Sequence, residues 1–142
     1  QQAVESSAEI QKEMKGNARF MFEYGPALHK LHEPELSNKV LKEALKVSGD
    51  PMILNIIGKN EQDMKHYDSA EYWFMRAVHR LPGRIYPYYL LANLYADPFF
   101  YRCDKLERMV QTVLEKEPKI QSTAIKQMRR KARELLKKVP EN

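Results

Sequence analysis

The segment Pro51–Pro82 constrains the fold of this chain more than any other part of the sequence. Its first half reads apolar-x2-apolar-Gly, ending at Gly58, and its second half reads Ala70-x3-Phe74 followed by Ala77. The small residues stand where two helices can cross closely, and the second half has the spacing of one apolar helix face. The closing proline cannot continue that helix. We therefore predict two helices joined by a turn over this segment.

The same pattern occurs once on each side of the segment. Downstream, Tyr88–Ala92 repeats the first half of the pattern, and upstream Met21–Gly25 does so. The upstream copy is more degenerate, with Ser37 in the place that Ala70 takes in the central copy. The sequence therefore predicts three units, at about residues 18–50, 51–84 and 85–118.

This spacing resembles the tetratricopeptide repeat (TPR) family, whose units are helix-turn-helix pairs. The resemblance implies an all-α fold, a right-handed α-solenoid in which each unit buries its apolar faces against its neighbours. Two ends of the chain fall outside the units. We expect residues 1–16 to form either a linker or a packed helix. Residues 119–142 are expected to form a basic capping helix and tail, with Ser122 or Thr123 as the N-cap.

The TPR resemblance also implies a binding surface, because the first helices of TPR units line a concave groove. The side chains expected along this groove are Phe22 and His29 in the first unit, Asn55, Lys59 and Gln62 in the second, and Tyr86, Tyr89 and Asn93 in the third. Tyrosines beside amides suit an extended peptide or polymer, since each offers apolar area and a hydroxyl group. The alternative is that the two tyrosines pack against the neighbouring unit or the capping helix.

Basic residues are concentrated at the C-terminal end of the chain. The net charge is +5, and residues 119–142 hold eight Lys or Arg against Glu134 and Glu141, a balance of +6. The cations expected on the exposed face of the capping helix are Lys126, Arg129, Arg130, Arg133 and Lys137. Three interpretations stay open: a solvated outer face, contact with an anionic membrane surface, and contact with nucleic acid. No aromatic residue is interleaved with these charges to stack on bases, which disfavours nucleic acid.

No pattern in the sequence indicates catalysis. His29 and His32 could share a helix face, but no Cys or close pair of carboxylates completes a metal site. The sequence contains no glycine-rich phosphate loop, nucleophile elbow or zinc spacing. Cys103 is the single cysteine, so an internal disulfide is excluded, and no apolar run approaches the ~20 residues that span a bilayer. We therefore expect no catalytic residue, metal or cofactor in this chain.

Two runs, Leu81–Tyr95 and Glu115–Arg129, are unusual for a generic TPR unit. Together with Phe20–Gly25, they resemble the C-terminal helical-repeat region of O-antigen ligase- or polymerase-related membrane proteins of Bacteroidetes-type bacteria, over about residues 17–138. The resemblance implies a parent glycosyltransferase of the bacterial inner membrane, whose catalytic membrane domain is missing from this chain. The chain would then be a soluble, non-catalytic domain, cytoplasmic or periplasmic, that organises partners in surface polysaccharide assembly. The alternative is an independent TPR scaffold that binds an extended peptide in its groove.

Overall fold

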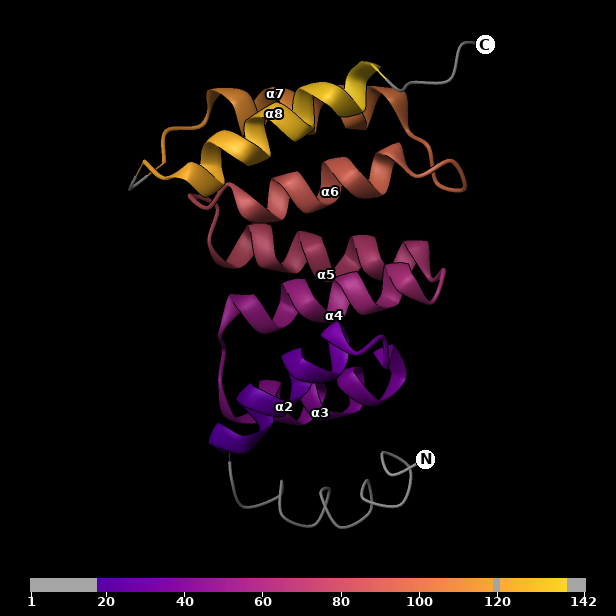
Figure 1. Cartoon of the computed structure of the whole chain (residues 1–142), viewed down its shortest axis with the longest axis vertical. Coiled ribbons are helices and arrows are strands. Elements are labelled where there is room, and N and C mark those ends of the chain that lie inside the picture. Colours follow the sequence, from indigo (N-terminus) through magenta and orange to yellow (C-terminus); the bar gives the residue numbers. More distant parts are fainter. Residues whose placement is uncertain (1–17, 119–120, 138–142) are drawn as a thin grey trace.

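The computed structural model describes residues 18–118 and 121–137, which form seven α-helices and no strand. In chain order the helices are α2 (Ala18–Lys30), α3 (Pro34–Val47), α4 (Pro51–Asp63), α5 (Tyr67–Arg80), α6 (Tyr86–Ala96), α7 (Cys103–Glu115) and α8 (Thr123–Lys137) (Figure 1). The linker or helix expected at residues 1–16 lies outside the described residues.

The helices stack along the long axis of the molecule, with α2 and α3 at one end and α7 and α8 at the other (Figure 1). Helix α2 pairs with α3, α4 with α5, and α6 with α7, and each pair also contacts the next. The first helices of successive pairs touch as well, α2 against α4 and α4 against α6. The predicted all-α solenoid of three helix pairs and a capping helix is therefore confirmed.

The crossing of α4 and α5 shows why the central pair needs small residues. A Cβ atom on Gly58 would lie 2.5 Å from Cε1 of the buried Phe74 ring, so a larger residue fits only if the ring moves. Ala70, on the same helix as this ring, is fully buried. The first pair uses the same arrangement, because a Cβ atom on Gly25 would collide with the buried side chain of Leu41. Close helix crossing therefore recurs at the positions that the repeated pattern marks.

The turns within the first two pairs share a backbone conformation. His32 after α2 and Lys65 after α4 both have a positive φ, of 60° and 66°. In each turn the following residue donates its N–H to the carbonyl oxygen five residues earlier, at 2.9 and 2.8 Å. This left-handed helix ending is one that glycine usually supplies, because glycine has no Cβ to strain. The two turns are thus equivalent in conformation, although neither contains glycine.

Helix α8 closes the stack by packing one apolar stripe onto the preceding helices. Its Ala132 is fully buried, and Ile125, Met128 and Leu135 pack against the core shared with α6 and α7. The Ser122 hydroxyl accepts a hydrogen bond from the N–H of Ile125 at 3.3 Å, so Ser122 acts as the N-cap. No helix in the described part of the chain is long and apolar enough to cross a membrane.

Candidate functional site

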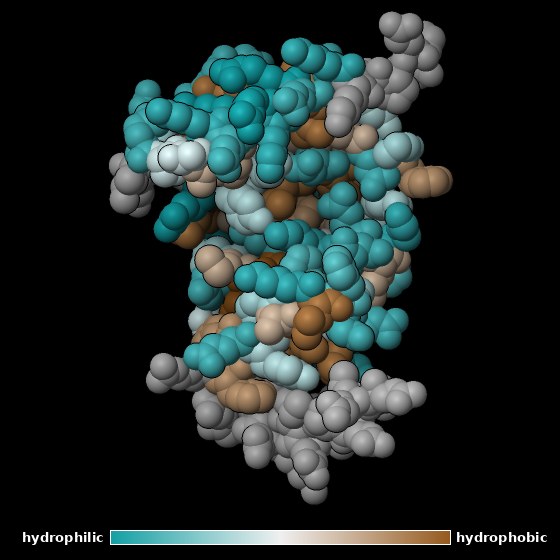
Figure 2. Space-filling view, in the orientation of Figure 1, coloured by the Kyte–Doolittle hydropathy of each residue, from teal (hydrophilic) through white to brown (hydrophobic). Residues whose placement is uncertain are grey.

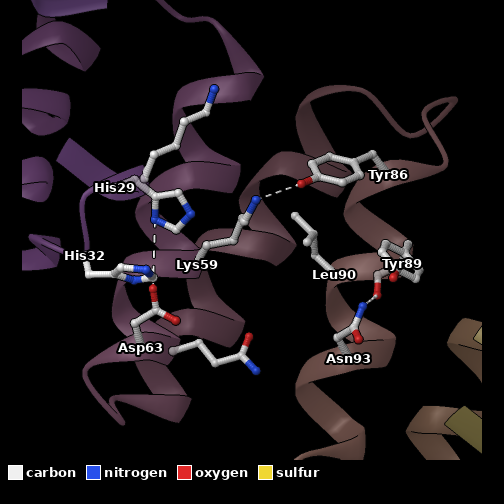
Figure 3. Close-up of a pocket in the computed structure, with 10 residues that line it drawn as sticks. His29, His32, Lys59, Asp63, Tyr86, Tyr89, Leu90 and Asn93 are labelled. Carbon is white, nitrogen blue, oxygen red and sulfur yellow. Dashed lines mark hydrogen bonds and ion pairs between the residues drawn. The ribbon is translucent and has the colours of Figure 1, made fainter. Parts of the chain in front are cut away.

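A cavity of about 490 Å³ opens on the side of the solenoid formed by the first helices of the three pairs (Figure 3). Helices α2, α4 and α6 and the turn after α2 supply its lining, which is His29, Lys30, His32, Lys59, Gln62, Asp63, Tyr86, Tyr89, Leu90 and Asn93. The cavity is an open groove and not an enclosed chamber. We call it the groove below.

The structure brings six of the eight expected groove residues together around this cavity: His29, Lys59, Gln62, Tyr86, Tyr89 and Asn93. The other two lie elsewhere. Phe22 packs against the core between the first two helix pairs, and Asn55 is only 6% exposed. Neither side chain lines the groove.

Lys59 and Tyr86 join α4 to α6 across the groove. The Lys59 ammonium donates a hydrogen bond to the Tyr86 hydroxyl oxygen at 3.0 Å. The same nitrogen lies 5.7 Å from the ring centroid, so it sits at the hydroxyl edge of the ring and not over its face. The ammonium keeps two N–H groups and the hydroxyl keeps its own proton, and these donors remain available to a ligand.

His29 is held by a buried polar network that reaches into the core. The Asn60 amide donates one hydrogen to Ser37 Oγ and the other to Asn38 Oδ1, both at 2.8 Å. Its oxygen must therefore accept from His29 Nδ1, which lies 2.7 Å away. Ser37 in turn donates to the carbonyl oxygen of Gly25 at 2.7 Å, so the serine that departs from the repeated pattern has a structural role.

This network determines which nitrogen of the neutral His29 ring carries the proton. Because Nδ1 carries the proton that Asn60 accepts, the Nε2 atom of the neutral ring is a hydrogen-bond acceptor. Figure 3 shows this second nitrogen on the side of the ring that faces Lys59. The groove thus offers a fixed acceptor at its α2 wall and donors at its α4 and α6 walls.

The charge of the groove is mixed, with a small positive excess. Lys30 and Lys59 are cationic, and Asp63, which is half exposed, is the single carboxylate in the lining. His29 Nδ1 lies 3.9 Å from the Asp63 carboxylate, a longer contact than its hydrogen bond to Asn60. With neutral histidines the lining carries one net positive charge, which suits a polar or weakly acidic ligand.

Four lining residues were not among the expected set: Lys30, His32, Asp63 and Leu90. Three of them directly follow an expected residue along the chain, and His32 lies one helical turn after His29. The width of a helix face could have found three of them, because Asp63, Leu90 and His32 stand three or four residues after an expected groove residue. Residues at i, i+3, i+4 and i+7 all belong to such a face, and a single-residue stripe is too narrow.

The expected basic surface on α8 is present for four of its five residues. Lys126, Arg130, Arg133 and Lys137 are exposed. Arg129 does not belong to it, because its side chain is half-buried and bonded to the backbone at the end of α7. Its guanidinium donates to the carbonyl oxygens of Val113 at 3.0 Å and Lys116 at 2.6 Å. A cation there satisfies carbonyl groups that have no partner within the helix.

Within residues 18–118 and 121–137, no group of three or more His, Cys, Asp or Glu side chains is placed to hold a metal ion. What the groove offers is hydrogen bonding and apolar contact: two tyrosine rings, two ammonium groups, two amides and one histidine acceptor. These groups equip it to bind a ligand.

Comparisons with known proteins identify the fold and no family. No protein-family model matches the chain, and no curated protein matches it. Among solved structures, the chain is similar to the crystal structure of MamA, with a TM-score of 0.68 and 18% sequence identity, over 96% of this chain and 84% of that chain. MamA is a TPR-like protein, and this chain therefore has a TPR-like α-solenoid fold.

Proposed function

We propose that this chain is a non-catalytic interaction module that binds an extended peptide in the groove. The observation that carries the proposal is the convergence of α2, α4 and α6 side chains on one open cavity. Tyr86 and Tyr89 offer apolar area with hydroxyl groups, and Lys59, Gln62 and Asn93 offer polar groups to a peptide backbone. An extended chain exposes carbonyl and N–H groups along its length, so it can use all three helices at once.

The open shape of the groove favours a peptide over a small cofactor. Sites for small ligands usually bury most of the ligand surface in a concave pocket. This groove is open to solvent along the first helices of three pairs, so a compact ligand would stay largely exposed. A segment of chain running along the solenoid would cover more of the lining.

A selection from a random 12-residue peptide library against the full chain tests this proposal. Binding of the selected peptides is then compared by fluorescence polarisation in Lys59→Ala and Tyr86→Ala, and in the control variants Lys39→Ala and Tyr72→Ala. The control residues are exposed on the second helices α3 and α5. We expect both groove variants to weaken binding about tenfold or more and the controls to leave it within twofold, since hydrogen-bonding and aromatic anchors dominate such interfaces. Equal affinity in all four variants would contradict a role for the groove.

We further propose that the module belongs to a membrane-bound O-antigen ligase- or polymerase-like protein of the bacterial inner membrane. The support for this is the resemblance of Leu81–Tyr95 and Glu115–Arg129 to that region of those proteins. On this proposal the module organises partners in surface polysaccharide assembly, and the catalytic residues lie in the parent protein. The second candidate, an independent TPR scaffold, rests on the same groove.

The gene sequence upstream of the codon for Gln1 separates these two candidates. Several segments of ~20 apolar residues in the same reading frame would support a membrane-bound parent. A start codon close to Gln1, with no such segments, would favour the independent scaffold.

A further inference from the structure

Four cations form a straight row along the outer side of α8. Lys126, Arg130, Arg133 and Lys137 stand at positions i, i+4, i+7 and i+11. With 3.6 residues per turn they fall within a sector of about 60° and extend over roughly 16 Å of helix. All four side chains are exposed, and none of them makes a hydrogen bond or ion pair within the part of the chain that the structure describes. We call this row the basic stripe.

Packing and hydrogen bonds hold α8, the helix that carries the basic stripe, in one orientation about its own axis. Ala132 is fully buried, and Ile125 and Met128 pack against the core on the opposite side of the helix from the stripe. Arg129 bonds to two backbone carbonyl oxygens of the α7 end, which fixes the flank next to the stripe. The backbone positions that carry the stripe are therefore fixed on the solenoid.

Within residues 18–118 and 121–137, no acidic side chain pairs with the basic stripe. Like charges at i and i+4 on a helix repel each other. The acidic residue of α8, Glu134, falls outside the 60° sector and makes no ion pair in the described residues. An unpaired row of this kind is stabilised when an external anion approaches it.

The row of cations is complementary in charge to a surface that carries many anions. The stripe lies on α8, which closes one end of the stack together with α7 (Figure 1), and Figure 2 shows hydrophilic residues gathered over this end. Leu136, which is 37% exposed, lies beside the C-terminal end of the stripe and offers an apolar contact to a partner surface. Helix α8 has no aromatic side chain for base stacking.

We propose that the basic stripe binds an anionic phospholipid surface and so places the α7–α8 end of the solenoid against a membrane. Each cation brought to an anionic leaflet strengthens binding about fivefold, and the attraction is screened by salt. The groove lies on α2, α4 and α6 and takes no part in this contact. Failure of the lipid proposal therefore leaves the peptide proposal intact, and the converse also holds.

Co-sedimentation of the full chain with vesicles tests the proposal. The vesicles contain phosphatidylcholine with either 0% or 30% phosphatidylserine, at about 25 mM and about 300 mM NaCl. The variant Arg130→Gln/Arg133→Gln removes two charges from the stripe. The matched control Lys39→Gln/Arg84→Gln removes two exposed charges from α3 and the α5–α6 loop. None of these four side chains makes a hydrogen bond, ion pair or ring contact in the described part of the chain, so both variants are expected to fold.

We expect binding to the phosphatidylserine vesicles at low salt, loss of binding at high salt, and roughly 25-fold weaker binding for the stripe variant. The control variant should bind within about threefold of the wild type. Equal weakening in the two variants would show that net charge alone is sensed, and would overturn the assignment to α8. Absence of vesicle binding, with stripe-dependent binding of a 20-base-pair DNA or RNA duplex instead, would also overturn it and assign the stripe to nucleic acid.

Discussion

Nδ1 of His29 lies 2.7 Å from Oδ1 of Asn60, and this hydrogen bond connects the wall of the groove to the buried contact between the first two helix pairs. Asn60 is fully buried and uses all of its side-chain atoms that can form hydrogen bonds. The position of a ligand-facing side chain is therefore set by core packing. A substitution of Asn60 in the core should therefore change the position of His29 in the groove.

We expect Asn60→Ala to lower the free energy of unfolding by about 2 to 4 kcal/mol, because it removes three hydrogen bonds, two of them to the buried Ser37 and Asn38, together with packed atoms. Urea unfolding followed by circular dichroism measures this change. Gln62→Ala, two residues later on the same helix and half-buried in the groove, is the control and should cost less than about 0.5 kcal/mol. A loss as small for Asn60→Ala as for the control would show that the network adds nothing to stability.

Gly58→Ala should destabilise the chain even though alanine favours helices. Alanine gains about 1 kcal/mol over glycine in a helix interior. Its Cβ atom would lie 2.5 Å from the Phe74 ring, and forcing a packed core apart costs typically 1 to 3 kcal/mol. We expect a net loss of about 1 kcal/mol in thermal or urea unfolding. Gly83→Ala, which has no atom within 4 Å of the added carbon, should change stability by less than about 0.5 kcal/mol.

The repeated spacing was sufficient to predict the fold because it records the physical requirement for close helix crossing. Gly58 and Ala70 must be small because the Phe74 ring lies at the crossing, so this packing requirement is visible in the residue types. The groove was predicted less completely. Lys59, Asn93 and Asn55 were all assigned to it because they are polar residues on the first helices. Lys59 and Asn93 do line the groove, whereas Asn55 is buried.

Two features could not be predicted from residue types. The turns at His32 and Lys65 have a left-handed backbone without the glycine that usually signals it. Arg129 has the same side chain as its exposed neighbour Arg130, and only the end of α7, brought close by tertiary packing, gives it partners. Sequence periodicity predicts which face of a helix is apolar, but it does not predict which backbone groups another helix leaves free.

Lys65→Gly should stabilise the chain. A residue with a Cβ pays about 1 kcal/mol in the left-handed conformation that Lys65 adopts, and glycine does not. Lys65→Ala is the matched control, because it removes the same side chain, including the 6.0 Å approach of the ammonium to the Phe99 ring, while keeping the strain. We expect the glycine variant to unfold at a higher urea concentration than the alanine variant. The reverse order would argue against strain at this turn.

The raised pKa of Tyr95 predicts that the protein loses stability at alkaline pH. Burial, followed by the hydrogen bond that its hydroxyl donates to Glu71 at 2.5 Å, raises the pKa of Tyr95 well above its ordinary value of 10.0. The folded state therefore holds this proton more tightly than the unfolded state. The stabilisation is fully present below pH 10 and declines as the pH rises from 10 towards the folded-state pKa, by at most about 1.4 kcal/mol per pH unit.

The variant Tyr95→Phe isolates this effect. It should cost about 1 kcal/mol at pH 7, where the hydrogen bond to Glu71 is lost. Between pH 10 and pH 11 the difference in unfolding free energy between the wild type and the variant should shrink, because only the wild type has this group to titrate. Urea unfolding at a series of pH values measures the difference, and a gap that stays constant above pH 10 would contradict the assignment.

Arg129 and Arg130 are adjacent on α8, and the structure gives them opposite roles. Arg129→Gln removes two charge-assisted hydrogen bonds to the carbonyl oxygens of Val113 and Lys116 and should lower the unfolding free energy by about 1 to 2 kcal/mol. Arg130→Gln removes an exposed, unpaired cation and should leave stability within about 0.5 kcal/mol, or raise it slightly by relieving repulsion. Both variants lose one charge, so the comparison separates the capping contact from net charge. Thermal unfolding at low and high salt completes the test, because the half-buried capping contact should resist screening. If the two variants melt together at both salt concentrations, Arg129 is no more than another surface charge.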